Sequence, residues 1–140
     1  MGFFCSVQTQ LQAEGELMVV RYVVLLVLLV HGLSHLAGFL TSWTDAPLEF
    51  NAPVGRAFGL LWLVALAVFL GAAFGLLQRR AWWRGLAINA AVISLIAIFP
   101  SWFSFTPVIR FPAVLVNLVI FVALIPRWGD GVSAELMRHY

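Results

Sequence analysis

Four long runs of apolar residues, separated by short polar or aromatic stretches, dominate the chain. They cover Val19–Leu40, Ala57–Leu77, Trp82–Phe99 and Pro112–Ile125. Each run is continuous and apolar on all sides, which is typical of membrane-spanning helices, whereas the strands of a membrane barrel alternate. A helix needs about 20 residues to cross a bilayer, so the last two runs are short. The pattern predicts an all-α polytopic membrane protein, an antiparallel four-transmembrane-helix bundle.

The two ends of the chain are more polar than these runs. Residues 1–17 are predicted to be a polar N-terminal tail or an over-extended reading frame, because Met18-Val-Val-Arg21 resembles a natural start of a membrane protein. Residues 18–128 are predicted to form the transmembrane domain. Residues 129–140 are predicted to form a cytoplasmic C-terminal tail.

Composition agrees with a lipid environment. The chain is 63% hydrophobic and only 10% charged, whereas a soluble domain carries about 25% charged residues. The single cysteine, Cys5, excludes an internal disulfide and a pair of soft metal ligands. Lipid is therefore the expected solvent, and the bilayer is the first predicted partner.

All eight basic residues are arginines, and they flank the apolar runs. Six fall on one side of the predicted membrane and two on the other, which favours a topology with both termini on the cytoplasmic side. None form a long basic run, so no nucleic-acid partner is predicted. The six are Arg21, Arg79, Arg80, Arg84, Arg127 and Arg138, and the two are Arg56 and Arg110.

Two ionisable side chains, His31 and His35, lie inside the first apolar run. Their spacing of four residues places both on one helix face, together with Ser34 and Gly38. Ionisable groups at membrane depth are costly and usually face a protein interior or a wet cavity. These histidines are therefore the first candidates for function.

A polar layer is expected where other helices bring polar side chains to the same depth. Counted along the helix axes, His35, Ser94 and Asn117 reach a similar level when the fourth helix begins near Phe111. His31 then lies one turn deeper. The layer requires the first, third and fourth helices to be neighbours.

Small residues predict where helices approach closely. Ala67, Gly71 and Gly75 repeat every four residues in the second run, and Gly38 lies on the histidine face of the first. Such small-xxx-small patterns favour tight packing in membranes. Packing within one chain is favoured here, and a homo-oligomer is the alternative.

Three functions remain open from these residues. The preferred one is a non-enzymatic membrane component or accessory subunit, in which the histidine layer holds the helices and a membrane protein partner is possible. The second is a small proton or cation transporter using His31 and His35, since imidazole titrates near neutral pH. No Asp or Glu lies within any predicted span, so that transporter needs the outer-loop carboxylates Asp45 and Glu49 to fold inward.

The third function is a metal- or haem-binding oxidoreductase subunit. Catalytic zinc usually takes three protein ligands, and only His31 and His35 are available at depth. Two histidines on one helix cannot sandwich a haem. No cofactor is therefore predicted, but two alternatives stay open. One is a haem with a single axial histidine, and the other is a metal held by these two residues with a further ligand from Glu49 or a partner subunit. No nucleophile–base motif or phosphate loop is visible, which argues against an enzyme.

The stretch His31-Gly-Leu-Ser-His35-Leu-Ala-Gly-Phe39 resembles an HGxxHxxGF motif of small bacterial integral membrane proteins with four predicted helices and no assigned activity. That family carries a charged Asp–Lys segment before the fourth helix, where this chain has Trp102-Phe-Ser-Phe-Thr-Pro107. A DoxX-like relationship is suggested by four-helix size alone. The resemblance implies the fold and a location in the bacterial inner membrane, not a mechanism. It covers about Tyr22–Ile125, through Pro53-Val-Gly-Arg56, Gly59-Leu-Leu-Trp62, Trp82-Trp83 and Asn117.

Overall fold

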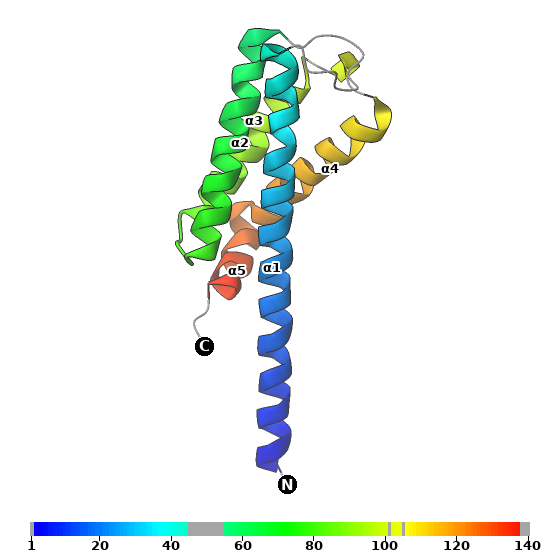
Figure 1. Cartoon of the computed structure of the whole chain (residues 1–140). Helices are drawn as coiled ribbons and strands as arrows, with labels where there is room; N and C mark the ends of the chain where they lie inside the picture. The colour runs from blue at the N-terminus through cyan, green and yellow to red at the C-terminus, as the bar shows by residue number, and fades with distance from the viewer. Residues whose placement is uncertain (1, 45–54, 101, 105, 138–140) are drawn as a thin grey trace.

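The computed structural model describes residues 2–44, 55–100, 102–104 and 106–137. Within these ranges the chain is helical and contains no strand, so the all-α class is confirmed (Figure 1). In chain order the elements are α1 (Gly2–Trp43), α2 (Arg56–Leu77), α3 (Trp83–Ile98), a 3-10 turn η1 (Trp102–Ser104), α4 (Pro107–Leu124) and α5 (Pro126–Leu136).

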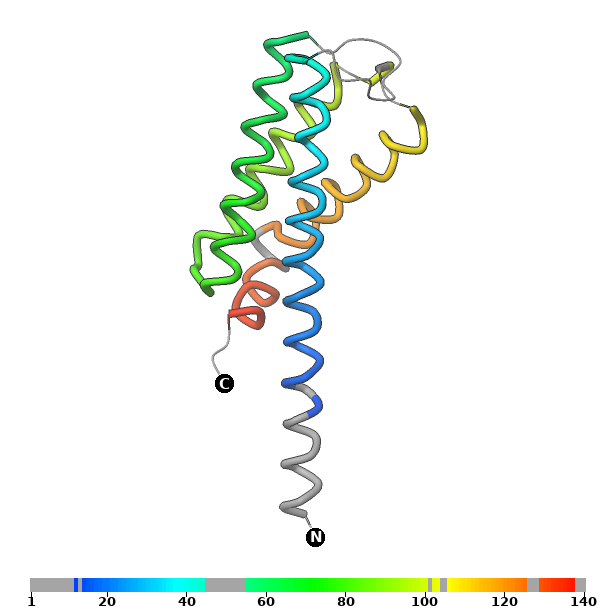
Figure 2. Tube along the Cα trace, viewed as in Figure 1, coloured from blue at the N-terminus to red at the C-terminus, as the bar shows by residue number. Residues whose placement is uncertain are grey.

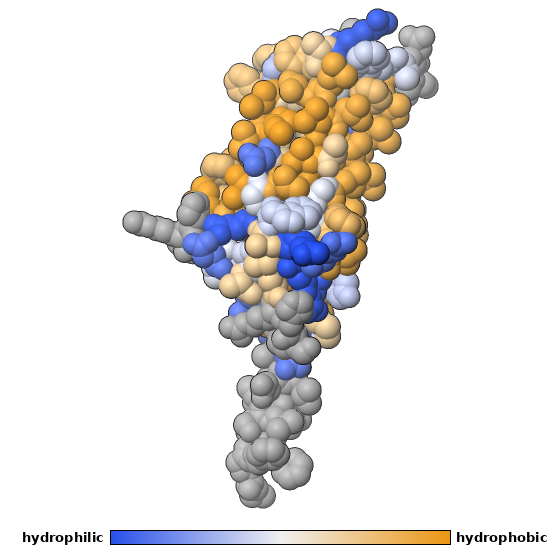
Figure 3. Space-filling view, turned by 90° about the vertical axis from the view of Figure 1, so that its left-hand side faces the viewer, coloured by the Kyte–Doolittle hydropathy of each residue, from blue (hydrophilic) through white to orange (hydrophobic). Residues whose placement is uncertain are grey.

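Three of these helices are long and apolar enough to cross a membrane. They are α1 from Glu14 onwards, α2 and α4, whereas α3 is apolar but has only 16 residues. The space-filling view shows the consequence, a broad apolar surface between a polar rim at the top and a polar cluster lower down (Figure 3). The chain is therefore a membrane protein.

Helix α1 is longer than the apolar run predicted. It begins at Gly2, so the segment expected to be a tail continues the helix and extends past the other elements (Figure 1). At ~1.5 Å per residue its 42 residues make roughly 63 Å, about twice the hydrocarbon thickness. The segment contains three Gln, two Leu and two Glu, which prolong a helix at little cost once the apolar run has formed it.

Helix α4 begins at Pro107, one and a half turns before the Pro112 that marked the predicted span. Proline is well suited to the first helical turn, where its missing N–H has no partner to lose. Pro112 therefore lies inside α4 rather than at its start. This shift changes the depth of every polar residue in the helix.

The predicted C-terminal tail contains an unexpected element, the short helix α5. Pro126 starts it, and both Ser133 and Leu136 are buried where α5 packs against α1 and α4. Arg84 of α3 also holds it, because its Nε donates to the carbonyl oxygen of Leu124 at 2.9 Å and its guanidinium pairs with Asp130. The chain therefore folds back onto the bundle after α4.

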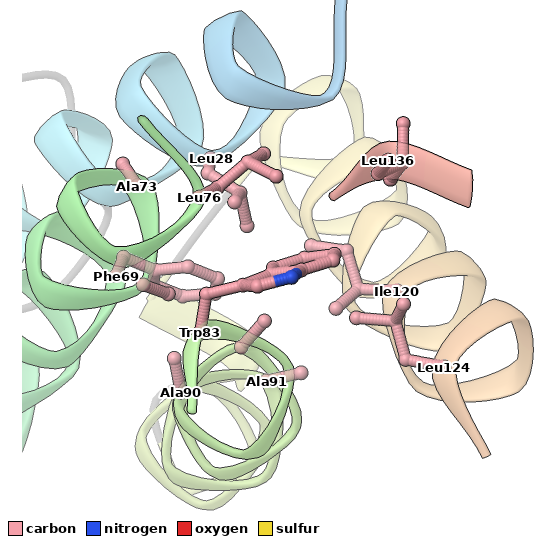
Figure 4. Packing of buried hydrophobic residues seen from close by; sticks show 12 residues of the cluster. Leu28, Phe69, Ala73, Leu76, Trp83, Ala90, Ala91, Ile120, Leu124 and Leu136 are labelled. Carbon is pink, nitrogen blue, oxygen red and sulfur yellow. The ribbon is translucent and has the colours of Figure 1, made fainter. Parts of the chain in front are cut away.

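The apolar core is centred on Trp83 at the start of α3. Its indole is fully buried between side chains of α2, α3 and α4 (Figure 4). Phe69 and Leu76 approach from α2, and Ile120 approaches from α4. Alanines on the buried face of α3 let the backbones come close, so one large ring fills the space between three helices.

The helices pack as neighbours in sequence, α1 with α2, α2 with α3, and α3 with α4. Helix α4 leans away from α1 towards its own N-terminal end (Figure 2). The side chains of α1 and α4 leave an apolar groove there.

The small residues singled out in the sequence divide into two groups. Gly38 and Gly75 are buried, and a Cβ on either would overlap an indole, that of Trp62 or Trp82 respectively. Gly71 is half-buried and Ala67 is exposed, so Ala67 lies outside the packed face. On a helix, each step of four residues rotates the side chain by roughly 40° around the axis. Three residues spaced by four therefore do not all face the same neighbouring helix.

Candidate functional site

Four polar side chains from three helices meet inside the apolar core. Only His31 shows any appreciable exposure, at 8%, and the other three are 0–1% exposed. His31 Nε2 lies 3.1 Å from Asn117 Oδ1, Asn117 Nδ2 lies 2.7 Å from Ser94 Oγ, and Ser94 Oγ lies 2.7 Å from His35 Nε2. We call this set, His31, Asn117, Ser94 and His35, the histidine circuit.

Helix α2 closes one side of the circuit with two aromatic rings. A Cβ at position 32 would lie 2.8 Å from the Cβ of Phe69. Glycine here and at position 38 therefore lets α2 approach α1 closely. The His31 ring lies 5.0 Å from the Phe69 ring, and the His35 ring lies 5.2 Å from the Trp62 ring. These rings exclude water from that side of the circuit.

The hydrogen-bond partners give the circuit a direction. His35 Nδ1 lies 2.8 Å from the backbone carbonyl oxygen of His31, which can only accept, so Nδ1 carries the proton. In a neutral imidazole Nε2 is then an acceptor, and the Ser94 hydroxyl donates to it. Ser94 Oγ accepts from the Asn117 amide nitrogen, and Asn117 Oδ1 accepts from His31 Nε2.

The opposite direction is excluded for a neutral circuit. If the Asn117 amide were turned over, Ser94 would donate to its oxygen, and His35 would have to donate from both ring nitrogens. His35 would then be a cation with 1% exposure among apolar side chains, which is costly. The neutral circuit therefore starts at the His31 ring and ends at the His31 carbonyl.

The other predicted site residues take different places. Ser34 is exposed and donates to the carbonyl oxygen of His31 at 2.6 Å, outside the circuit. Asp45 and Glu49 lie outside the described residues. Asn117 bonds directly to His31, and it is linked to His35 through Ser94. Because α4 starts at Pro107, Asn117 is further from the start of its helix than the sequence predicted.

Two connected cavities adjoin the circuit on the side where α4 leans away from α1. The larger, of about 460 Å³, is an open groove lined mainly by aliphatic residues of α1 and α4. The smaller, of about 210 Å³, is more enclosed and reaches His35, Trp62 and Arg110. The residues that line both are His31, Ser34, Ile109 and Ala113.

Arg110 is a site residue that sequence reasoning treated only as a topology signal. One of its terminal nitrogens donates to the Trp102 carbonyl oxygen at 3.2 Å, and its guanidinium carbon lies 4.8 Å from the Trp102 ring centroid. Its Nε is enclosed and finds no acceptor among the described residues. In the sequence, Arg110 stands next to an aromatic cluster and three residues before Ala113, which lines both cavities. This position could have marked it as a site residue.

The described residues contain no group of three His, Cys, Asp or Glu side chains that could hold a metal ion. Both ring nitrogens of His35 are already engaged within the protein. Comparison of the chain with protein families, with curated proteins and with solved structures gives no match.

Proposed function

We propose that this protein is a non-enzymatic component of a bacterial inner membrane, in which the histidine circuit fixes the positions of α1, α3 and α4. The single observation that carries the proposal is the closed circuit, in which each hydrogen bond determines the next. The circuit needs histidines from α1, a serine from α3 and an asparagine from α4. It can therefore form only when the three helices are aligned in one register.

The size of the effect suits a positioning role. Hydrogen bonds between membrane helices average ~0.6 kcal/mol each. Three such bonds in the circuit therefore contribute roughly 2 kcal/mol, by the same average. This is too little to drive helix association, but it is enough to disfavour a slipped register, in which buried polar groups lose their partners.

The full architecture we propose has four spans in an antiparallel bundle. Helix α3 would be the third span, although its 16 residues make only ~24 Å at 1.5 Å per residue. Trp82 directly precedes it, and Trp side chains favour the membrane interface and anchor the end of a short span. Its position between α2 and α4 supports this assignment.

The transport alternative requires a polar path through the membrane. The circuit begins and ends at His31 and occupies about one helical turn, ~5.4 Å, of a ~30 Å hydrocarbon core. No Asp or Glu occurs between Val19 and Leu40 or within α2, α3 and α4. These features favour the positioning role over proton or cation transport.

A double-mutant cycle between α1 and α4 tests the proposal. His31→Leu, Asn117→Leu and the double variant are purified in detergent, and the free energy of unfolding is measured by denaturant titration. We expect a coupling energy of about 0.5–1.5 kcal/mol between the two positions. An additive pair of effects contradicts the positioning role.

Flux measurements in proteoliposomes separate the alternatives. We expect the parent chain and the variant with both His31 and His35 changed to Leu to show the same low proton and cation leak. A parent flux that disappears in a variant that still folds would establish transport instead.

A further inference from the structure

An exposed asparagine interrupts the apolar outer face of α3. Asn89 is exposed, and its neighbours on the same side of the helix, Val92 and Ile96, are exposed and apolar. It lies six residues after Trp83, roughly 9 Å from the start of α3 and roughly 14 Å from its end. Long Lys and Arg side chains reach the interface from such depths, but the asparagine side chain is too short. In the proposed bundle the amide therefore faces hydrocarbon.

The Asn89 amide is only partly satisfied within its own helix. Its Nδ2 donates to the carbonyl oxygen of Gly85 at 2.8 Å. An amide nitrogen carries two hydrogens, and the amide oxygen is an acceptor. One hydrogen and the oxygen therefore have no partner among the described residues. Water satisfies such groups on a soluble helix, whereas in hydrocarbon they are costly without a partner.

The amide belongs to a narrow stripe along α3. Asn89, Val92 and Ile96 are spaced by three and four residues, the spacing at which side chains of one helix meet a parallel neighbour. We call these three residues the α3 stripe. Helix α3 packs against α2 and α4 through its opposite face, which is rich in alanine. The stripe is therefore exposed in the described part of the chain and is available to another helix.

The exposed face of α2 shows that spacing alone does not identify a contact. Leu63, Ala67, Leu70 and Phe74 are also exposed at intervals of three and four residues. All four are apolar, and lipid tails solvate them as well as another helix would. The amide of Asn89 distinguishes the α3 stripe, because lipid tails offer it no hydrogen bond.

A second copy of the chain satisfies the amide by symmetry. Two copies inserted with the same topology can be related by a twofold axis along the membrane normal, and twofold dimers are the commonest homo-oligomers. A residue close to that axis meets its equivalent at the same depth. Because a carboxamide both donates and accepts, each Asn89 can donate its free hydrogen to the oxygen of the other.

We propose that the chain forms a parallel homodimer through the α3 stripe, with the two Asn89 amides hydrogen-bonded to each other across the twofold axis. Val92 and Ile96 pack against their equivalents in the second copy. This inference rests on α3 being a membrane span, as in the proposed architecture. It leaves the histidine circuit intact, because Ser94 lies on the buried face of α3.

Energy transfer between labelled copies measures the dimer in a bilayer. Cyan and yellow fluorescent proteins are fused after Tyr140 of the full chain, and the two forms are reconstituted together in phosphatidylcholine liposomes at a series of protein-to-lipid ratios. We expect the transfer to follow a monomer–dimer isotherm and to saturate. Transfer no greater than that of randomly placed molecules would overturn the inference, and so would an isotherm that requires a larger oligomer.

Substitutions of Asn89 test the role of the amide. Asn89→Leu presents an apolar side chain to lipid, and we expect the dimer dissociation constant to rise about tenfold. Asn89→Gln retains the carboxamide and should stay within about threefold of the parent. Leu70→Ala, on the exposed face of α2, is the control and should match the parent. An unchanged dissociation constant in Asn89→Leu would overturn the inference.

Cysteine cross-linking locates the contact in native membranes. Val92→Cys and Leu70→Cys are each combined with Cys5→Ser, so that each variant contains one cysteine. Oxidation should link the Val92→Cys variant into a dimer and leave the Leu70→Cys variant monomeric. Cross-linking of the Leu70→Cys variant alone would place the contact on α2 and overturn the inference.

The two proposals fail separately. A coupling energy between His31 and Asn117, in a chain that shows no specific energy transfer, leaves the positioning role intact and removes the dimer. A dimer that depends on Asn89, without that coupling energy, supports the α3 contact and removes the positioning role.

Discussion

At the scale of single residues, the Ser94 hydroxyl connects α4 to α1, because the same oxygen accepts from Asn117 Nδ2 and donates to His35 Nε2. Ser94→Ala leaves Asn117 Nδ2 and His35 Nε2 without partners in a dry environment. We expect the free energy of unfolding in detergent to fall by about 1–2 kcal/mol. The control is Thr41→Val, because Thr41 is half-buried and donates only within its own helix, to Ala37. Thr41→Val should change the free energy of unfolding by no more than about 0.5 kcal/mol. Equal losses in both variants would show that Ser94 contributes no more than an ordinary hydroxyl.

Glycine at position 38 is a second determinant at this scale, because its missing Cβ makes room for the indole of Trp62. Gly38→Ala should displace Trp62 and destabilise the protein by about 1–3 kcal/mol, the usual cost of overpacking. Gly85→Ala is the matched control, since a Cβ there meets nothing within 4 Å in an exposed part of α3. That change should be neutral or stabilising by up to about 1 kcal/mol. Thermal unfolding in detergent measures both, and a tolerated Gly38→Ala would show that α1 and α2 are packed less tightly.

At the scale of helices, the end of α2 contains strain that a substitution can remove. Arg79 has φ of 56°, in the left-handed region, where it closes the helix through bonds from its own N–H to Leu76 and from the N–H of Arg80 to Gly75. Glycine usually occupies this position of a helix C-cap. Arg79→Gly should therefore raise the free energy of unfolding by about 1 kcal/mol, whereas Arg80→Gly should give no gain. Denaturant unfolding of both variants checks this, and destabilisation by Arg79→Gly would show that the side chain contributes more than the strain costs.

The helices also show what the sequence could predict and what it could not. Continuous apolar runs located α2 and α3 to within one residue at each end, because burial in lipid dominates those segments. Helix α5 was missed because few apolar residues lie among its Gly, Asp and Ser positions, and its burial depends on contacts with α1, α4 and Arg84. Sequence spacing identified the four circuit residues. The partner of Asn117 could not be predicted, because it depends on where α4 begins and how it leans.

At the scale of the whole molecule, side-chain contacts gather arginines at one end of the bundle. A terminal nitrogen of Arg21 donates to the carbonyl oxygens of Leu76 and Leu77 at the end of α2, beside the turn that carries Arg79 and Arg80. Arg84 reaches the end of α4 through Leu124. Arg56 and Arg110 lie at the starts of α2 and α4, at the opposite end (Figure 1). The fold therefore separates the arginines into two unequal groups.

This separation predicts the orientation of the protein in the membrane. Arginine-rich ends stay in the cytoplasm during insertion, so both termini and the α2–α3 turn should lie inside the cell. Green fluorescent protein fused after Tyr140 should fluoresce, and alkaline phosphatase fused there should be inactive. The same phosphatase fused after Thr44 should be active, because that point lies between α1 and α2 at the opposite end. Active phosphatase after Tyr140 would reverse this topology and would place the α1–α2 connection in the cytoplasm instead of outside the cell.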